Sequence, residues 1–461
     1  MILVKKPVVI IIFNFAQTLD FKSLIQKSLP RILFFYFCRH FTISFMTNYL
    51  QQRALYPPLI HNKPSLNLGL IIVIPCYDED FLLLTLMSLK KCELPDCDTE
   101  VIVVINHSAA EKKAVIEKNN ATYDQGLEWA KANSKTRLKF HLIYEGNLSK
   151  KHAGVGLARK IGMDEACFRL EKIKNKKGII VGFDADSRCQ RNYLVAIENH
   201  FRTHKKTPAA SIHFEHPVLG FDHEDSVYEA IVLYELHLRY YVHAQGFTGF
   251  PFAVQTIGSS MAVRSDFYQK QGGMNKRKAG EDFYFLHKFT PLGNYSEIKN
   301  TKVVPSPRIS HRVPFGTGKA VGEIVGAKQN LTTYHPQSFV DLKAFFATIP
   351  KLISLKTDDL TAYFETLPPS VAQFLKDQNF VEKLTEIQGN TKTLAAFKKR
   401  FFCWFNAFLL MKFVHFSRDE FYPNMEVQEA AVWCLKEKGM EISDTATAKE
   451  LLFTFRELDK K

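Results

Sequence analysis

The sequence predicts an α/β protein with an open, mainly parallel sheet, helices on both faces of the sheet, and a C-terminal helical region. Three observations predict this fold. Short apolar runs alternate with segments of helical spacing from residue 69 to about residue 225, which implies βαβ units. Polar residues follow directly after several of the apolar runs. From about residue 335 onward the chain has a helical pattern.

The first half of the chain gives its elements in order. The runs "LGLIIVIPCYDED", "EVIVVINHS" and "RLKFHLIYEG" are expected strands, separated by the helices "FLLLTLMSLKKC" and residues 109–133. The helix "HAGVGLARKIGMDEACFRLEKI" then leads to a fourth strand, "GIIVGFDADS". A helix at "NYLVAIENHFRTH" and a strand at "AASIHFEHP" complete the regular part.

After residue 225 the alternation is looser. The run "SVYEAIVLYELHLRYYVHAQ" is an expected helix with an aromatic face, and residues 253–273 suggest a strand or hairpin and a short helix. A helix begins within "AGEDFYFLHKFTP", and "TKVVPSPRISHRVPFGTGKAVGE" is a strand that runs into a loop rich in Pro and Gly. We therefore expect an α/β domain over residues 66–330 and a helical region over residues 335–461.

The N-terminal 45 residues allow more than one interpretation. The stretch "MILVKKPVVIIIFNFA" imitates a signal peptide, but no small-residue cleavage site follows it. Neither this run nor "RILFFYFCRHFTISFM" reaches the roughly 20 apolar residues that span a bilayer. The alternative is that the protein starts at Met46, so that residues 1–45 are translated upstream sequence.

Charge and cysteine content restrict the partners and the compartment. The net charge of +14 and the pI near 9.2 favour anionic partners such as nucleotides and phosphates. No nucleic-acid-binding motif accompanies this charge, so we expect no nucleic acid partner. The eight cysteines do not have the spacing of a disulfide framework, which favours reduced thiols and a cytoplasmic protein. Such a protein could be dissolved in the cytoplasm or lie at the inner face of the cell membrane.

The fourth expected strand ends in Asp184-Ala185-Asp186. Two carboxylates held at a strand end can reach one divalent cation, and Mg²⁺ is usually bound through one or two carboxylates and substrate phosphates. The alternative is that one aspartate caps the next helix and the other is solvated. Ligands of open α/β sheets bind at the carboxyl ends of the strands, which favours a metal and diphosphate site.

The ends of the first two strands offer further groups at the same edge. Pro75 ends the first strand, the Tyr77 ring could stack on a base, and Glu79 could accept a hydrogen bond. Asn106 stands at the end of the second strand, where an Asx turn is the alternative interpretation. Arg159 could meet a diphosphate. The "GVGLAR" stretch lies inside a helical pattern, which excludes a dinucleotide fingerprint.

Two later motifs add acidic and basic groups. Glu281 and Asp282 follow Gly280 at the start of a helix, where acidic residues suit the helix dipole or supply a general base. A glycine before them would allow a close backbone approach. His311 and Arg312 follow the last strand, and they could complete a metal shell and contact phosphates.

Taken together, these motifs resemble a family 2 glycosyltransferase of the GT-A fold, of the bacterial type. The matching stretches occur in family order over about residues 69–320: "VIPCYDE", "VVINHS", "GVGLARKIGMDEA", "GFDADS", "GSSMAVRSDFYQKQGG" and "AGEDFYF". The resemblance implies an inverting, hexosyltransferase-type transfer from a nucleoside diphosphate sugar, with Mg²⁺ or Mn²⁺. It also implies a glycan or lipid-linked acceptor, as in cell envelope polysaccharide.

The resemblance implies a role for each matching residue. Asp282 would be the catalytic base, with Glu281 supporting the acceptor. Asp186 would ligate the metal, with Asp184 beside it and His311 as a further ligand. The nucleotide sugar would be held by seven residues: Pro75, Tyr77, Glu79, Asn106, Arg159, Asp184 and Arg312. The family often has Asp at the position of Asn106.

Two other functions compete with glycosyl transfer. A nucleotidyltransferase could have a similar sheet and metal site, but it tends to carry a basic, Gly-rich loop where this chain has the acidic "PCYDEDF". A non-catalytic nucleotide- or carbohydrate-binding protein on a degenerate fold is the third hypothesis.

Residues 397–416 are rich in aromatic residues and lysines, and form either an interfacial membrane helix or a core helix. Their apolar residues occupy nearly all sides, which favours the core.

Overall fold

The computed structural model describes residues 47–327 and 330–461. The chain divides into two units, Met1–Ala54 and Leu55–Lys461. The described part of the first unit contains helix α4 (Asn48–Gln52). The two interpretations of residues 1–45 fall outside the described residues. All of the elements below belong to the second unit.

The second unit is built on an eight-stranded, mostly parallel sheet, which confirms the predicted α/β fold class. The strand order is β3-β2-β1-β4-β7-β6-β8-β5. The pairs formed by β1 with β2, β1 with β4, β2 with β3, and β6 with β8 are parallel, whereas β7 and β5 pair antiparallel with their neighbours. The strands are β1 (Leu68–Cys76), β2 (Asp98–Ser108), β3 (Leu138–Leu148), β4 (Ile179–Gly182), β5 (Arg188–Cys189), β6 (Ala209–Phe214), β7 (Met261–Arg264) and β8 (Ser296–Val304).

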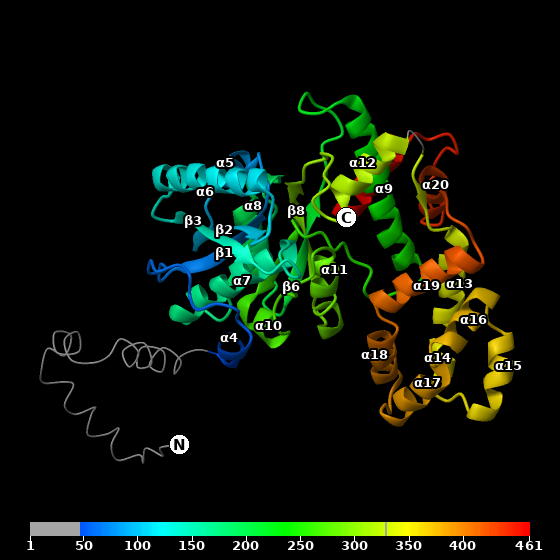
Figure 1. Cartoon of the computed structure of the whole chain (residues 1–461). Helices are drawn as coiled ribbons and strands as arrows, with labels where there is room; N and C mark the ends of the chain where they lie inside the picture. The colour runs from blue at the N-terminus through cyan, green and yellow to red at the C-terminus, as the bar shows by residue number, and fades with distance from the viewer. Residues whose placement is uncertain (1–46, 328–329) are drawn as a thin grey trace, which may run out of the picture. The chain divides into compact units, whose positions relative to one another are not determined.

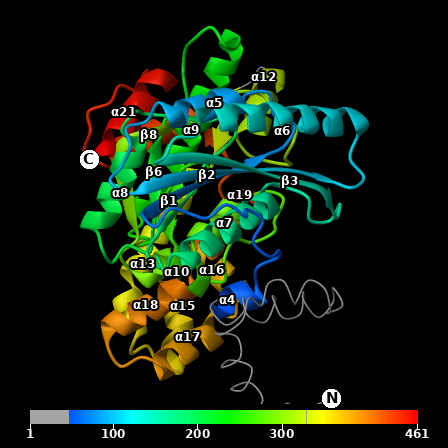
Figure 2. The ribbon, with the colours of Figure 1, turned by 90° about the vertical axis from the view of Figure 1, so that its left-hand side faces the viewer.

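Helices cover both faces of the sheet, as the continuous apolar strands require. In Figure 2, α5 and α6 lie over one face of β1, β2 and β3, and α7 lies under the other. Strand β1 is buried along almost its whole length because both of its faces are covered. The helices of this part are α5 (Leu82–Lys90), α6 (Lys113–Asn133), α7 (Val155–Lys172), α8 (Tyr193–Thr203), α9 (Asp225–Phe247), α10 (Ser265–Lys270), α11 (Glu281–Leu286) and α12 (Thr317–Ala327).

Helix α12 corrects the expectation of a loop through residue 323. The loop ends at Gly316, and the helix begins at Thr317 in spite of its glycines. A Cβ atom at Gly318 would lie 2.5 Å from the Cβ atom of Ser310, so a larger residue would push the helix away from the preceding loop. The glycines therefore allow close packing here rather than marking a loop.

The C-terminal part is helical, as predicted, and its last helices lie beside α9 in Figure 1. A two-stranded antiparallel sheet pairs β9 (Thr332–Thr333) with β10 (Met425–Glu426). The helices are α13 (Pro336–Ala347), α14 (Ile349–Leu352), α15 (Leu360–Glu365), α16 (Pro369–Asp377), α17 (Phe380–Gly389), α18 (Leu394–Trp404), α19 (Ala407–Glu420), α20 (Val427–Lys436) and α21 (Ala448–Lys460).

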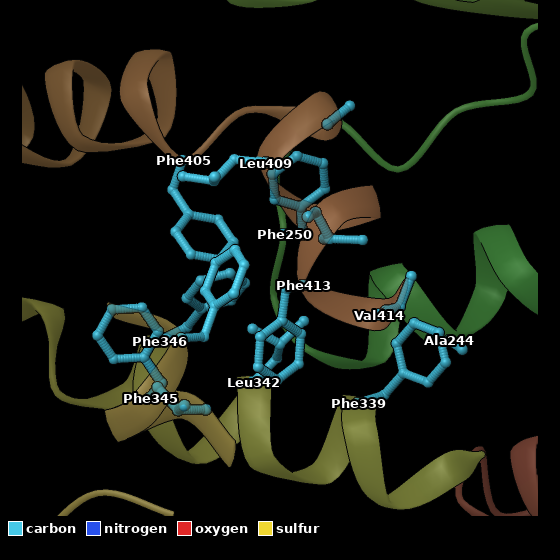
Figure 3. Close-up of a cluster of buried hydrophobic side chains, with 14 of the residues drawn as sticks. Ala244, Phe250, Phe339, Leu342, Phe345, Phe346, Phe405, Leu409, Phe413 and Val414 are labelled. Carbon is cyan, nitrogen blue, oxygen red and sulfur yellow. The ribbon is translucent and has the colours of Figure 1, made fainter. Parts of the chain in front are cut away.

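An aromatic core holds these helices together and joins them to α9. Figure 3 shows Leu342 of α13 and Phe413 of α19 packing together, with Ala244 of α9 nearby. Residues 397–416 form two helices, broken at Phe405 and Asn406. Their phenylalanines are largely buried in this core, which confirms the core interpretation of the segment. Within residues 47–327 and 330–461, no helix combines the length and the apolarity needed to cross a bilayer.

A buried ionic network links α9 to α21. Glu235 is fully buried and accepts hydrogen bonds from Arg239 (Nε, 2.8 Å) and Arg456 (Nη2, 2.7 Å). The backbone N–H of His216 donates to the same carboxylate at 2.8 Å. Burial alone would raise the pKa of Glu235, but the two arginines and His216 hold it well below its ordinary value. Glu235 is therefore ionised, and its charge is compensated from both helices.

A second buried ion pair gives a prediction on stability at low pH. Glu100 of β2 accepts a hydrogen bond from Arg169 of α7 at 2.7 Å, and its side chain is 2% exposed. Burial alone would raise its pKa, but Arg169 and His141 lower it from 4.5 to about 2. The stabilisation is therefore complete above pH 4.5 and is lost as the pH falls through about 2.

We expect Glu100→Gln to reduce the acid-dependent change in stability between these two pH values by roughly 3 kcal/mol, the contribution of this one carboxylate. Urea unfolding followed by fluorescence at several pH values measures this change. The exposed Glu117→Gln substitution on α6 serves as the matched control. An unchanged acid dependence in Glu100→Gln would contradict the prediction.

Candidate active site

A cavity of about 780 Å³ opens at the carboxyl ends of strands β1, β2 and β4. Parallel strands end at one edge of the sheet, and ligands of open α/β sheets bind there. Ten of the eleven predicted site residues line this cavity: Pro75, Tyr77, Glu79, Asn106, Arg159, Asp184, Asp186, Glu281, Asp282 and Arg312. The exception is His311, which is exposed and lies outside the lining.

The end of β1 is fixed by a buried amide on α6. Asp78 has a φ of 51°, which is uncommon for a residue other than glycine. Its backbone N–H donates to Oδ1 of Asn119 at 2.9 Å, and Asn119 also donates to the carbonyl of Asn106 at 3.5 Å. Asn119 thus holds together the ends of β1 and β2, and both of these ends line the cavity.

Tyr77 lies on the cavity wall with its hydroxyl engaged. The hydroxyl bonds to the carboxylate of Glu111, and burial together with this carboxylate raises the pKa of Tyr77 to about 12. The phenol therefore stays protonated at neutral pH. A protonated, tethered ring is suited to stacking against a flat ligand.

Arg159 joins two of the acidic groups. Its guanidinium is buried on α7 and donates to Asp184 of the Asp-x-Asp motif and to Glu281 of α11. A Cβ atom at Gly258 would lie 2.4 Å from the guanidinium, so only glycine leaves room for this side chain. Arg159 is therefore held in place by its partners, and it neutralises charge on one side of the cavity.

Asp186 and Glu79 form a second acidic group, bridged by two arginines. Arg308 donates from Nε to Oδ2 of Asp186 at 2.9 Å, and its Nη2 donates to Glu79. Arg312 donates from Nη1 to Oε2 of Glu79 at 2.9 Å and to the carbonyl of Tyr77 at 2.8 Å. Two guanidinium groups therefore stand beside the Asp-x-Asp motif.

Burial and mutual repulsion raise the pKa of both carboxyls in this group. Burial raises the pKa of Asp186 to about 6, the charge of Asp184 adds to the effect, and Arg312 opposes it. Burial and the charge of Asp186 likewise raise the pKa of Glu79, again opposed by Arg312. Carboxylates placed so close together favour a cationic ligand or neighbour.

Sequence reasoning missed Arg308. The stretch "PSPR" carries two prolines directly after β8, and proline fixes its own φ angle and favours an extended residue before it. A cation after such a rigid stretch, at the edge where the acidic residues meet, was a signal that could have been used.

Asp282 stands at the start of α11, on the cavity wall. Its Oδ1 accepts the backbone N–H of Phe283 at 2.8 Å. Burial raises the pKa of Asp282, and the Arg159 guanidinium opposes this shift. Burial also raises the pKa of Glu281, which is paired with Arg159.

Gly280, directly before Glu281 and Asp282, allows another part of the chain to approach the backbone closely, as the sequence predicted. It has a φ of 66°, and a Cβ atom there would lie 3.1 Å from the ring of Phe315. The loop that follows β8 can thus approach the start of α11 closely. Glycine is required at this position both for its backbone conformation and for the space it leaves.

The side chains of the cavity fit a divalent metal ion only if a bound ligand supplies part of its coordination. Among the described residues, no group of three or more His, Cys, Asp or Glu side chains could hold a metal ion. Asp184 and Asp186 nevertheless both line the cavity, and Mg²⁺ commonly uses one or two carboxylates together with substrate phosphates. The aspartates therefore fit an ion shared with a bound diphosphate, and not one held by protein side chains alone.

The cysteines do not take part in disulfide bonds where the structure describes them. The free thiols are Cys76, Cys92, Cys97, Cys167, Cys189, Cys403 and Cys434. Cys76 lines the cavity, and burial raises the pKa of its thiol far above the ordinary value. Its thiol is therefore protonated and is a poor nucleophile at neutral pH.

Comparison with known proteins found similarity in structure but not in sequence. No family model matches the chain, and no curated protein matches it. Residues 1–349 of S. aureus TarS in complex with UDP-GlcNAc match at 14% identity and a TM-score of 0.37, over 82% of this chain and 93% of that one.

Two further solved structures have similar scores. The mannosyltransferase PcManGT from Pyrobaculum calidifontis, in complex with GDP-Man and Mn²⁺, matches at 12% identity and a TM-score of 0.34, over 89% of this chain and 93% of that one. GalNAc-T7 with UDP, GalNAc and Mn²⁺ matches at 15% identity and a TM-score of 0.33, over 69% of this chain and 57% of that one. Scores this low establish no family for this chain.

Proposed function

We propose that this chain is an inverting glycosyltransferase of the GT-A type, which moves a sugar from a nucleoside diphosphate sugar to an acceptor hydroxyl. One observation carries the proposal. The Asp-x-Asp carboxylates, two arginines and the carboxylate of Asp282 all line one cavity at the carboxyl edge of the sheet. The motif order along the chain, which resembles family 2, gives independent support.

The donor would lie across the ends of β1, β2 and β4. The Tyr77 ring would stack on the base, with Pro75, Glu79 and Asn106 beside the nucleoside. Arg308 and Arg312 would turn from the carboxylates to the diphosphate, because guanidinium groups bind phosphate oxygens well in a bidentate geometry. A divalent ion held by Asp186 and Asp184 would add positive charge at the same diphosphate.

Asp282 would act as the general base. As its carboxylate takes the proton of the acceptor hydroxyl, the oxygen forms a bond to the anomeric carbon from the side opposite the diphosphate. The bond between that carbon and the diphosphate oxygen breaks, and its electron pair leaves with the diphosphate. Arg308 and Arg312 stabilise the charge that develops on the leaving group. Glu281 would keep Arg159 in place, and Arg159 would orient Asp184.

A donor panel tests the proposal. The full chain is incubated with UDP-, GDP- and dTDP-sugars, with and without Mn²⁺, and nucleoside diphosphate and free sugar are measured. Release of both from one donor is the expected result, since a glycosyltransferase transfers slowly to water. Pyrophosphate formed from a nucleoside triphosphate and a sugar phosphate would identify a nucleotidyltransferase instead. Donor binding without turnover would favour a non-catalytic protein.

We expect Arg308→Lys to lower kcat/KM for the donor by roughly tenfold. Lysine keeps the charge but loses the planar group that contacts Asp186 and Glu79 together. Steady-state kinetics over a range of donor concentrations measures the effect. Lys299→Arg, on the outer part of β8, is a control for a change of cation away from the cavity. Full activity in Arg308→Lys would remove Arg308 from donor binding.

A further inference from the structure

The cavity continues beyond the predicted donor residues into a second part, here called the aromatic arm. Tyr234, His237 and Tyr241 of α9 line it, together with His287 of α11 and Tyr334 and Met411 of the C-terminal helical region. The three α9 residues are spaced at i, i+3 and i+7, so they lie on one face of the helix. This is the aromatic face that the sequence predicted, and the donor residues do not account for it.

The rings of the aromatic arm support one another. The ring centroid of His237 lies 6.3 Å from that of Tyr234 and 6.2 Å from that of Tyr334, and the rings of Tyr241 and Tyr334 lie 5.5 Å apart. Two polar tips are tethered: His237 Nδ1 bonds Thr333 Oγ1 at 2.8 Å, and Tyr334 OH bonds His415 Nε2 at 2.8 Å. The ring faces are therefore held in position before any ligand binds.

The residues of the aromatic arm carry no formal charge at neutral pH. Burial lowers the pKa of both His237 and His287 to about 4, so both imidazoles are neutral. Three charged groups outside the arm act on its tyrosines. Burial, and then the Asp282 carboxylate, raise the pKa of Tyr234 to about 12, whereas burial raises the pKa of Tyr334 and Arg418 and Asp419 shift it in opposite directions. Asp282 also interacts electrostatically with Asp184. The proposed base thus lines the same cavity as the donor residues and the aromatic arm, and it interacts electrostatically with a residue of each.

We propose that the aromatic arm binds the acceptor as a neutral pyranose ring, whose reacting hydroxyl is directed toward Asp282. This inference rests on the proposed function, because it assigns the acceptor class to the same cavity. It also gives the C-terminal helical region a role in substrate choice, since Tyr334 and Met411 come from that region.

The chemistry of the aromatic arm favours this ligand class over others. The C–H bonds on one face of a pyranose carry a slight positive charge and pack against the negative face of an aromatic ring. The hydroxyl and imidazole groups of the arm can exchange hydrogen bonds with sugar hydroxyls. A uronic acid or a sugar phosphate would find no cation among these residues and would be repelled by Asp282.

Ligand-observed NMR on the full chain tests the inference without any transfer reaction. Methyl glucoside, galactoside, mannoside and N-acetylglucosaminide are compared with methyl glucuronide and glucose 6-phosphate, with and without UDP and Mn²⁺. When UDP and Mn²⁺ are present, so that Arg308 and Arg312 are engaged, at least one neutral glycoside should bind more tightly than both anions. Tyr241→Leu and Tyr234→Leu should each weaken that binding about 2- to 10-fold, the value of one aromatic contact.

Matched variants separate the ring face from other effects. Tyr241→Phe keeps the ring and should bind within about twofold of the wild type. Phe247→Leu makes the same kind of change on α9 outside the cavity and should bind as the wild type does. Thermal melts identify any variant that fails to fold. If the leucine variants do not fold, binding is compared between Tyr241→Phe and His237→Phe instead.

Three results would overturn the inference: no neutral glycoside binds under either condition, an anion binds as tightly when UDP and Mn²⁺ are present, or the leucine variants bind unchanged. Affinity that comes from the alkyl chain of octyl glycosides and not from the sugar would also overturn it, in favour of a lipid tail. Failure of the donor panel with intact glycoside binding would remove the proposed enzyme function alone. Donor turnover without glycoside binding would remove this inference alone.

Discussion

Asp282→Asn is expected to lower turnover by roughly 10²- to 10⁴-fold, the usual contribution of a general base. The amide has nearly the same shape as the carboxylate, and its oxygen can still accept the backbone N–H of Phe283. It cannot take a proton from an acceptor hydroxyl. Donor affinity and thermal stability should therefore change little, while the rate of the chemical step falls.

The pH dependence of the wild type gives a second check on Asp282. Burial raises the pKa of this carboxyl above its ordinary value of 3.8, and the base works only when ionised. Activity should thus fall on the acid side at a pH above that ordinary value. Because burial also raises the pKa of Asp186 to about 6, the residual activity of Asp282→Asn should keep the acid limb of Asp186 and lose only the part that belongs to Asp282. Asp377→Asn, an identical change at an exposed position on α16, is the control. Full turnover in Asp282→Asn would remove this residue from the mechanism.

Glu235→Gln is expected to destabilise the protein by about 3–5 kcal/mol, the usual result of removing one partner from a buried ion pair. The substitution removes the one buried charge that the guanidinium groups of Arg239 and Arg456 share. Asp459 still pairs with Arg239, so Arg456 loses most. The midpoint of urea unfolding, followed by circular dichroism, measures the effect.

Two comparison variants make this result specific. Glu229→Gln, an exposed position on the same helix, should leave the midpoint nearly unchanged. The double variant Glu235→Leu with Arg456→Leu should be more stable than Glu235→Gln, because removing both partners leaves less uncompensated charge. An unchanged midpoint in Glu235→Gln would mean that the network contributes little.

Much of the fold could be predicted because buried strands and helices leave recognisable patterns of apolar residues in the sequence. The continuous apolar runs of β1, β2 and β4 are buried on both faces, and the order of strands and helices follows from their alternation. Strand direction after β4 could not be predicted, because antiparallel pairing of β7 depends on contacts distant in sequence. Helix α12 was missed because its glycines serve packing against Ser310, and a single sequence does not distinguish this use from a loop.

The candidate site could be predicted where its residues follow strands, and less well where they follow loops. Asp184 and Asp186 come directly after β4, and the sheet edge brings them to the cavity. Arg308 and His311 lie on the loop after β8, whose path depends on contacts with Gly280 and α12. The prediction of Arg159 as a diphosphate ligand could not foresee that its guanidinium lies between Asp184 and Glu281. The assignment of roles to these residues stays a prediction.

The buried carboxylate of α9 has a consequence for synthesis on the ribosome. Glu235 and its partner Arg456 are 221 residues apart in the chain. At about 5–20 residues per second, translation supplies the second residue about 10 to 45 s after the first. During that interval Glu235 has Arg239 and the backbone of His216 as partners but lacks Arg456, so the interior between α9 and α21 is completed only after the last helix has been made.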